Sequence, residues 1–328
     1  MLKFLVRRIL LGIFVLWVVS MIIFGLFFID PAGPEAVAHR LAGRTATPAT
    51  IHLIEVRLGL NQPIIVQYWH FIWGSSQQNG LLKGSLGYDY YNGVSVNHII
   101  AQAFPITFWL ATGAAVLWLS MGLFTGIVSA VRPRSFLDRA FTTLALFFYS
   151  LPTFVLGLLL LLWLFYDLTK HGLHWFPPGE YVDLTSNPWE WFHHLILPWI
   201  TLAVVSAAAY TRLSRGSMLD VLGEDYIRTA RAKGLSERRV VLRHGLRAAL
   251  TPIVTQFGID LGVLIGGAIV TEQVFSLQGL GYTTINAITN DDLPVVLGVT
   301  MVASTAVVVA NILVDIAYAV LDPRVRLN

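Results

Sequence analysis

A series of apolar segments, each about as long as a lipid bilayer is thick, constrains the fold of this chain more than any other feature. An α-helix needs about 20 mostly apolar residues to cross the hydrocarbon core of a membrane. The sequence contains six such segments, at residues 9–29, 105–131, 140–166, 195–212, 252–274 and 294–321. We therefore expect an all-α, polytopic membrane protein with six transmembrane helices.

The composition supports this class and excludes several others. Of the 328 residues, 55% are hydrophobic and 12% are charged, and the mean hydropathy is +0.67. A soluble domain of this size is not so apolar. The sequence pI near 9.2 comes mostly from loop arginines, so no nucleic-acid partner is expected. The absence of cysteine excludes a disulfide framework, a thiolate metal site and a cysteine nucleophile.

The sequence shows no motif for catalysis or nucleotide binding. None of Lys3, Lys83, Lys170 and Lys233 follows a glycine, so the Gly-x4-Gly-Lys-Ser/Thr phosphate loop does not occur. No Ser/His/Asp grouping and no His-Glu-x-x-His motif is present. The neighbouring His193 and His194 follow several aromatic residues, which is typical of a membrane interface. We expect no catalytic residue, no cofactor and no metal.

The basic residues set the expected orientation in the cell membrane. Most of the 22 Lys and Arg lie at one set of ends of the six apolar segments. Cytoplasmic loops carry this excess, so both termini and residues 213–251 are expected in the cytoplasm and residues 30–103 outside. The first apolar segment is longer than the roughly 7–15 residues of a signal-peptide core, and we expect it to be retained as a transmembrane helix.

Two regions are expected along the chain. Residues 1–103 hold the first transmembrane helix and an extracytoplasmic segment, and residues 104–328 hold a transmembrane domain with a five-helix core. In that domain Gly122 and Gly126, and also Gly258, Gly262 and Gly266, are spaced for close helix contact. Pro152 is expected to kink the third helix. Residues 276–293 are expected to form a glycine-containing outer loop.

The polar, basic stretch at residues 224–252 lies between two apolar segments and has a helical pattern of its own. Tyr226, Ile227 and Ala230 share one face at a spacing of three and four residues. Gly234 is placed to end this helix, and Ser236 to cap the next one. In the second helix basic side chains recur every four residues, at Arg239, Arg243 and Arg247. We expect a helix, a glycine turn and a basic amphipathic helix.

This stretch resembles the cytoplasmic coupling loop of ABC importer permeases. In that loop Glu-Ala-Ala is followed by three residues and a glycine, whereas this chain has Arg228-Thr229-Ala230 before Gly234. The string YIRTARAKGL at residues 226–235, with RHGLR at residues 243–247, resembles the variant found in dipeptide and oligopeptide importers. A match of about twenty residues between two membrane spans is more specific than the short motif alone. A basic loop that only fixes topology is the simpler alternative.

The resemblance implies a permease subunit of a peptide-class ABC importer, embedded in membrane lipids. It implies a second permease subunit, two cytoplasmic ATP-binding subunits and an extracytoplasmic solute-binding protein as partners. ATP would drive alternating access, and this chain would be no enzyme itself. The expected ATPase-coupling residues are Glu224, Tyr226, Arg228, Thr229, Ala230, Ala232, Lys233 and Gly234.

Three polar residues in or near the fifth apolar segment are candidates for the transport pathway or for helix packing: Gln256, Asp260 and Glu272. A lipid-facing Asp is costly, so Asp260 should face protein or a wet cavity. A proton relay is one interpretation, and packing against a polar partner is the one we favour. Glu272 precedes a Gly279-Leu280-Gly281 segment that also resembles the family.

Two further classes of function remain as alternatives. An ion-coupled secondary transporter would use Asp260 as its ion-binding carboxylate, although no repeat with matched broken helices is visible. A membrane scaffold without transport activity would explain the topology, but it would leave the coupling pattern without a role.

Overall fold

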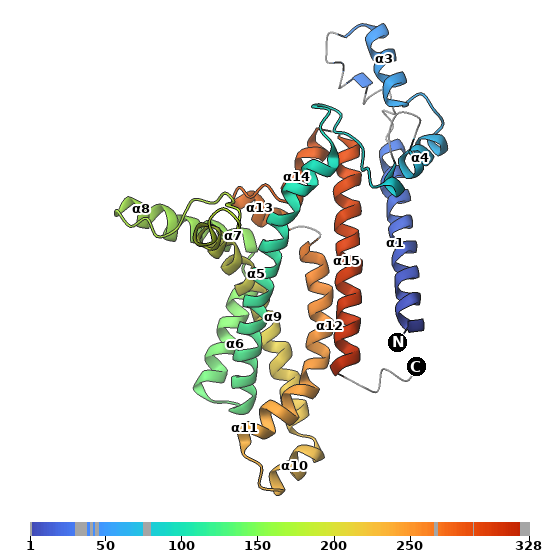
Figure 1. Cartoon of the computed structure of the whole chain (residues 1–328). Helices are drawn as coiled ribbons and strands as arrows, with labels where there is room; N and C mark the ends of the chain where they lie inside the picture. The colour runs from blue at the N-terminus through green and yellow to red at the C-terminus, as the bar shows by residue number, and fades with distance from the viewer. Residues whose placement is uncertain are drawn as a thin grey trace. The chain divides into compact units, whose positions relative to one another are not determined.

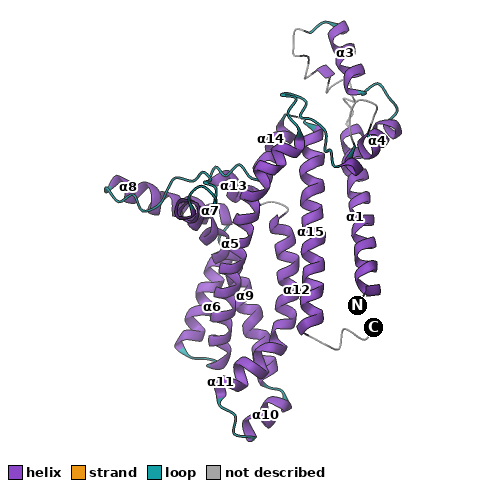
Figure 2. Cartoon of the chain, in the orientation of Figure 1, coloured by secondary structure: helices purple, strands orange, loops and turns teal. Residues whose placement is uncertain are grey.

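The structure is a computed structural model that describes residues 2–29, 38–39, 42, 46–74, 80–265, 268–290 and 292–321 (Figure 1). Throughout these ranges the fold is helical, without a named strand (Figure 2). The helices are α1 (Leu2–Ile29), α3 (Pro48–Leu58), α4 (Ile64–Trp73), α5 (Val96–Val131), α6 (Phe136–Tyr149), α7 (Thr153–Leu160), α8 (Leu168–Lys170), α9 (Pro188–Leu222), α10 (Asp225–Ala232), α11 (Glu237–Arg239), α12 (Leu246–Ile265), α13 (Ile269–Val274), α14 (Leu280–Thr289) and α15 (Leu293–Leu321). Two π-helical turns, Leu161–Asp167 and Val240–Gly245, lie between helices.

The chain divides into two compact units that do not follow its order. The first contains Met1–Pro105 and Gly279–Ala306, and the second contains Ile106–Gln278 and Val307–Asn328. Helices α5 and α15 each contribute residues to both units. In this division residues 279–306 group with the N-terminal residues, and the domain boundary expected at residue 103 stays a prediction.

The first unit has two apolar clusters. The start of α5 packs against α14 and α15 through Val96, Leu280 and Val299, all nearly inaccessible to solvent. In the second cluster Phe24 of α1 lies beside Leu297 of α15. Helix α4 joins this second cluster through aromatic side chains and through a 2.8 Å hydrogen bond between the hydroxyls of Tyr68 and Ser20. The N-terminal helix is therefore held by side-chain packing as well as by the chain itself.

The second unit is organised around α5 and α9. Its largest buried side chains include Trp118 of α5 and Tyr210 of α9, whose rings lie 6.2 Å apart. The predicted close contact at Gly122 and Gly126 is present. A Cβ atom on Gly126 would lie 2.8 Å from the carbonyl oxygen of Thr211 on α9 and would also meet the side chain of Ser214. Small residues let transmembrane helices approach at this distance.

Five helices in the described ranges are long and apolar enough to cross a membrane: Val6–Gly25, Val96–Val131, Thr153–Lys170, Pro188–Leu222 and Leu293–Val314. They overlap the first, second, third, fourth and sixth predicted spans. The fifth predicted span, residues 252–274, corresponds to α12 and α13 and is not one of these five. The membrane-helix class is confirmed, while the number of six spans and the cytoplasmic position of both termini stay predictions.

Two predicted spans are interrupted where single helices were expected. Pro152 does not kink a continuous helix; α6 ends at Tyr149 and α7 begins at Thr153, directly after the proline. Proline lacks a backbone N–H and disfavours a helical residue before it, and both effects act here. In the fifth span α12 ends at Ile265 and α13 begins at Ile269. Residues 266 and 267 lie outside the described ranges, and Ala268, with φ −73 and ψ 46, is not helical.

The predicted ends of other elements also need correction. Helix α9 has 35 residues, far more than the expected 195–212. It begins earlier because the Asn187 side chain caps it by accepting hydrogen bonds from the N–H groups of Trp189 and Glu190, and it continues to Leu222. The expected outer loop at residues 276–293 contains α14 instead. Gly258 and Gly262 contact α15 as the glycine stripe predicted, and Gly266 lies outside the described residues.

The contact between α5 and α9 can be tested with one methyl group. Gly126→Ala should lower the stability of the protein by about 1–3 kcal/mol, because the new Cβ has no room beside the backbone of α9. Gly216→Ala in α9 is the control, since nothing lies within 4 Å of its added Cβ and alanine favours the helix. Thermal unfolding in detergent measures both. Equal melting temperatures for the two variants would contradict this packing.

Candidate functional site

The segment that resembles a coupling loop forms a hairpin between α9 and α12. Helix α9 ends at Leu222, α10 covers Asp225–Ala232, and α11 continues through the π-helical turn into α12 (Figure 1). Gly234 turns the chain between the two halves with φ +77, a conformation that a residue with a Cβ rarely adopts. Ser236 sits at the predicted cap position of α11, although its side chain makes no capping hydrogen bond. The predicted helix, glycine turn and second helix are all present.

The inner face of the hairpin is apolar and packs against other residues of this chain. Ile227 and Val240 are inaccessible to solvent, and Ala230 is 8% exposed. These three side chains form one cluster, against which Leu222 and Leu235 pack. Ala230 is one of the predicted coupling residues, and it lies against the second half of the hairpin. Its small side chain therefore fits the internal packing, and its part in coupling stays a prediction.

The outer face of the hairpin is open. Between residues 223 and 239 every residue is exposed except Ile227, Ala230 and Leu235. The other predicted coupling residues therefore lie on one continuous accessible segment: Glu224, Tyr226, Arg228, Thr229, Ala232, Lys233 and Gly234. Tyr226 is the one aromatic residue among them, and it is 46% exposed. This arrangement suits the binding of another protein, because the hairpin keeps its shape without using these residues.

The hairpin is attached firmly to the helices of the second unit. Val241 of the π-helical turn packs with Met218 of α9, Ala130 of α5 and Ala249 of α12 in a buried cluster. Ser217 of α9 donates a hydrogen bond of 2.9 Å to the carbonyl oxygen of Ala249. A force on the hairpin is consequently passed to α9 and α12, since both ends are packed and not merely tethered.

The surface of the hairpin is rich in arginine. Arg231 binds Glu237 through two hydrogen bonds of 2.7 and 3.1 Å, which lower the pKa of that carboxyl, and Arg228 lies 3.2 Å from Asp225. Such exposed pairs contribute little to stability. Four further arginines are exposed without an ion pair to any described residue: Arg238, Arg239, Arg243 and Arg247. The hairpin thus presents a net positive surface.

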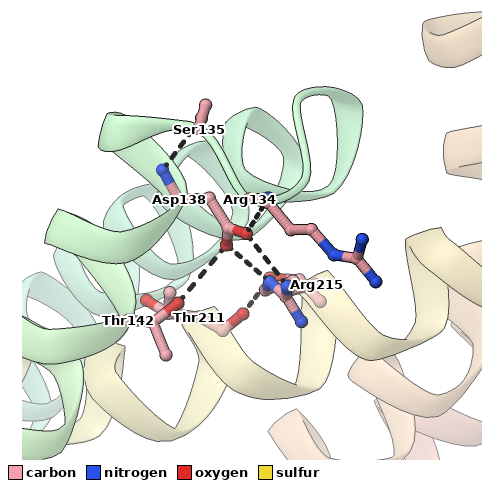
Figure 3. Close-up of polar contacts among 7 residues, drawn as sticks. Arg134, Ser135, Asp138, Thr142, Thr211 and Arg215 are labelled. Atoms are coloured by element: carbon pink, nitrogen blue, oxygen red, sulfur yellow. Dashed lines mark hydrogen bonds and ion pairs between the residues drawn. The ribbon is translucent and has the colours of Figure 1, made fainter.

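An ion pair joins α6 to α9, with the Asp138 carboxylate buried and the Arg215 side chain 31% exposed, and Figure 3 shows its partners. Arg215 of α9 donates from Nε and Nη2 to the two carboxylate oxygens of Asp138, at 2.7 and 3.0 Å. The backbone N–H of Arg134 donates to the same carboxylate at 2.8 Å, and Arg134 takes φ +64 to do so. Nearby, the guanidinium of Arg212 lies 4.3 Å from the centre of the Tyr149 ring.

The charge of Asp138 is therefore strongly stabilised. The hydrogen bond from Arg215 lowers the pKa of Asp138 from 3.8 to about 2, although burial opposes this shift. The resulting stability is complete above pH 3.8 and lost as the pH falls toward 2. Sequence reasoning missed this pair. The pattern Ser135-x-x-Asp138 was the available signal, since the Ser135 hydroxyl caps α6 by accepting from the Asp138 N–H at 3.2 Å.

Removing one member of this pair should be costly. Arg215→Ala leaves the buried Asp138 carboxylate without its main partner, and we expect a loss of about 1.5–3 kcal/mol in unfolding free energy at neutral pH. Arg238→Ala, at an exposed arginine of the hairpin, should change it by less than about 0.5 kcal/mol. Thermal unfolding in detergent compares the two. If Arg215→Ala unfolds at the temperature of the Arg238→Ala control, the pair does not stabilise the fold.

The polar candidates in or near the fifth predicted span form two groups of contacts. Asp260 of α12 accepts hydrogen bonds of 2.8 Å from the Tyr210 hydroxyl on α9 and from the Gln256 amide one helical turn away. Glu272 of α13 is fully buried and accepts from the Thr107 hydroxyl of α5 at 2.6 Å. The structure brings Gln256 and Asp260 together and places Glu272 with another helix. Both contacts agree with the packing interpretation favoured from the sequence.

In the first unit two carboxyl groups meet where the sequence gave no signal. Asp89, before α5, and Asp292, before α15, are both almost fully buried, and each shifts the pKa of the other. Asp89 also accepts from the backbone N–H of Tyr91 at 2.6 Å and from the Asn92 amide at 2.8 Å. Burial and the neighbouring Asp89 raise the pKa of Asp292 to about 7. At Asp89 burial raises the pKa, but the hydrogen bonds that its carboxylate accepts outweigh this effect, so the pKa of Asp89 is lowered.

This pair predicts that the first unit loosens locally as the pH rises from acid toward neutral. An acid with a raised pKa contributes stability that is complete below its unfolded value, 3.8 for Asp292, and is lost progressively as the pH rises to about 7. Between these two values the proton released on opening should increase opening by up to about tenfold per pH unit, and above pH 7 the increase should level off. Hydrogen exchange of residues 89–96 and 287–296, corrected for intrinsic rates, measures this. Asp292→Asn should remove the dependence, and an unchanged slope in that variant would rule out Asp292 as its source.

Histidines and acidic residues do not gather into a metal centre in the described ranges, where no group of three or more potential ligands occurs. The predicted interfacial histidines bind backbone instead. His194 Nδ1 lies 2.5 Å from the carbonyl oxygen of Gly179, and His193 contacts the carbonyl oxygen of Trp175. The two rings thus have different partners and no shared ligand position.

Comparison with known proteins defines the class of this chain. The family model for the binding-protein-dependent transport system inner membrane component matches residues 122–327, and its N-terminal companion matches residues 1–111. A probable peptide ABC transporter permease of Sinorhizobium fredii is 38% identical over 323 residues, covering 98% of this chain and 99% of that protein. The glutathione transport system permease GsiC of Escherichia coli strain K12 is 36% identical, covering 99% of each chain.

A solved structure shows the same fold. The MetNI methionine ABC transporter, crystallised in inward-facing conformations, aligns with a TM-score of 0.54 over 69% of this chain and 97% of that chain, at 18% identity. Fold, exposed hairpin and sequence together define a membrane permease of the ABC importer class. The chain belongs to the family of binding-protein-dependent transport system inner membrane components. The alternative of an ion-coupled secondary transporter was therefore wrong.

Proposed function

We propose that this permease carries peptides or similar small solutes across the membrane. Its relatives at 36–38% identity are named as peptide or glutathione permeases and match it over nearly its whole length. The sequence strings at residues 226–235 and 243–247, which resemble those of peptide importers, lie on the hairpin between α9 and α12. Within this solute class the binding protein outside the cell selects the cargo.

The hairpin is the proposed docking site for the ATPase, and the observation that carries this proposal is its division into two faces. Ile227 and Ala230 hold it together from inside, while Tyr226, Arg228 and Ala232 are exposed. An element with a self-sufficient core and an open surface can bind a partner without refolding. Packing of Val241 against Met218 then transmits movement of the partner to α9.

The full transporter would contain two such permease subunits, two cytoplasmic ATP-binding subunits and an extracytoplasmic solute-binding protein. ATP binding would close the ATPases and rotate the permeases between inward-facing and outward-facing states. This chain supplies pathway and coupling, and ATP is hydrolysed in the separate subunits. The proposal includes six spans, cytoplasmic termini, an N-terminal region at residues 1–103 and a transmembrane domain at residues 104–328.

One substitution on the open face tests the docking. Ala232→Trp adds a large side chain to the exposed segment without entering the inner cluster, and it should weaken ATPase binding by about 1–3 kcal/mol through overpacking. Co-purification of the ATPases and ATP-driven uptake in proteoliposomes measure the effect. We expect uptake to fall and the permease to remain folded and inserted.

Two controls separate docking from folding. Ala49→Trp makes the same change at an exposed position of α3, in the segment expected outside, and should leave ATPase co-purification unchanged. Ala230→Trp enters the inner cluster and should lower the melting temperature of the permease itself. Parent-like ATPase binding and uptake in Ala232→Trp would mean that the hairpin is only a basic cytoplasmic loop.

A further inference from the structure

Helix α12 has two covered faces and one open face. Gly258 and Gly262 lie against Val314 and Val307 of α15, and Ile253 is buried in the cluster that α5 and α9 form. The remaining face carries exposed Thr255, Gln256, Ile259 and Val263. Asp260, half-buried, lies between this open face and the side of α12 that contacts α9. The carboxylate is therefore accessible from the open face.

The hydrogen bonds around Asp260 leave acceptors on that face. The Tyr210 hydroxyl and the Gln256 amide each donate one hydrogen bond of 2.8 Å to the carboxylate. The Thr255 hydroxyl donates to the Thr251 carbonyl oxygen at 3.1 Å. A carboxylate has about four acceptor positions, and Gln256 keeps its amide oxygen. This face can therefore accept further hydrogen bonds, and the apolar side chains of Ile259 and Val263 lie on the same face.

The Asp260 carboxylate forms no ion pair with a basic side chain in the described part of the chain. A carboxylate exposed to hydrocarbon is costly, so this face borders water or another molecule. Tyr210 is 1% exposed and fixed by packing against Trp118, which holds its hydroxyl in position. The carboxylate is consequently oriented in advance, as binding groups usually are.

We propose that Asp260, oriented by Tyr210 and Gln256, binds the protonated amino group of the transported solute. An ammonium group carries three donors and one positive charge, which match the free acceptors and the unpaired charge on this face. Ile259 and Val263 offer apolar surface for the rest of the solute. This inference rests on the proposed function, because peptides are solutes of this chemistry.

Photo-cross-linking tests the contact directly. A photoreactive residue replaces Ile259 in the complete, detergent-solubilised transporter without nucleotide or binding protein. The probes are a radiolabelled tripeptide of alanine and the same peptide with an acetylated amino group. We expect the free peptide to label this chain, and we expect labelling about tenfold weaker for the acetylated peptide and for the Asp260→Asn variant. The photoreactive residue at Val116, exposed on α5, is the control position and should give no comparable label.

Three results would overturn the proposal. Equal labelling by the two peptides would show that the amino group is not recognised, and equal labelling in Asp260→Asn would exclude the carboxylate. A cross-link to the second permease subunit in place of the peptide would make this face a subunit contact. ATP-driven uptake of the tripeptide by the parent transporter in proteoliposomes is measured alongside. Absence of that uptake, together with absence of label, would overturn the proposed function itself.

Discussion

The close approach of α5 and α9 is the contact on which the second unit depends. Gly122 and Gly126 bring the two backbones together, and Ser214 then donates a hydrogen bond of 2.8 Å to the carbonyl oxygen of Gly122. The hydroxyls of Thr125 and Thr211 meet at 2.7 Å along the same line. In a bilayer, helices gain little from hydrophobic burial against one another, so close packing and interhelical hydrogen bonds hold them. Helix α9 also carries the ion pair to α6, the hydroxyl that reaches Asp260 and the entry to the hairpin.

Much of this arrangement was predictable from the sequence because it depends on local chemistry. Apolar length identified the membrane helices, and the spacing of Gly122 and Gly126 identified a close contact. Gly234 marked the turn of the hairpin, where its positive φ requires that residue. Helical periodicity identified Ile227 and Ala230 as inward positions, but it placed Tyr226 on the same face, and Tyr226 is 46% exposed. Each of these features is decided by neighbours within a few residues.

What the sequence could not supply depends on residues far apart along the chain. The Asp138–Arg215 pair and the Asp89–Asp292 pair join segments separated by many residues, and no local pattern links their members. The packing of Ala230 was not predictable for a related reason. Its small size suits close approach by either an internal or an external neighbour, and only the position of Val240 decides between them. The sequence analysis placed Pro152 and Ala268 inside single spans, because apolar length does not reveal whether a helix continues.

The division of the hairpin into an inner and an outer face has a consequence for how such permeases diverge. Residues that keep the hairpin folded, such as Ile227 and Val240, are not the residues that a partner touches first. Substitutions at exposed positions such as Arg228 and Thr229 therefore carry little folding penalty. On the proposed docking role, a lineage could change which ATPase it binds by substitutions in the hairpin, while its transmembrane helices stay unchanged. In this chain, arginine and threonine already occupy two positions where the related pattern has glutamate and alanine.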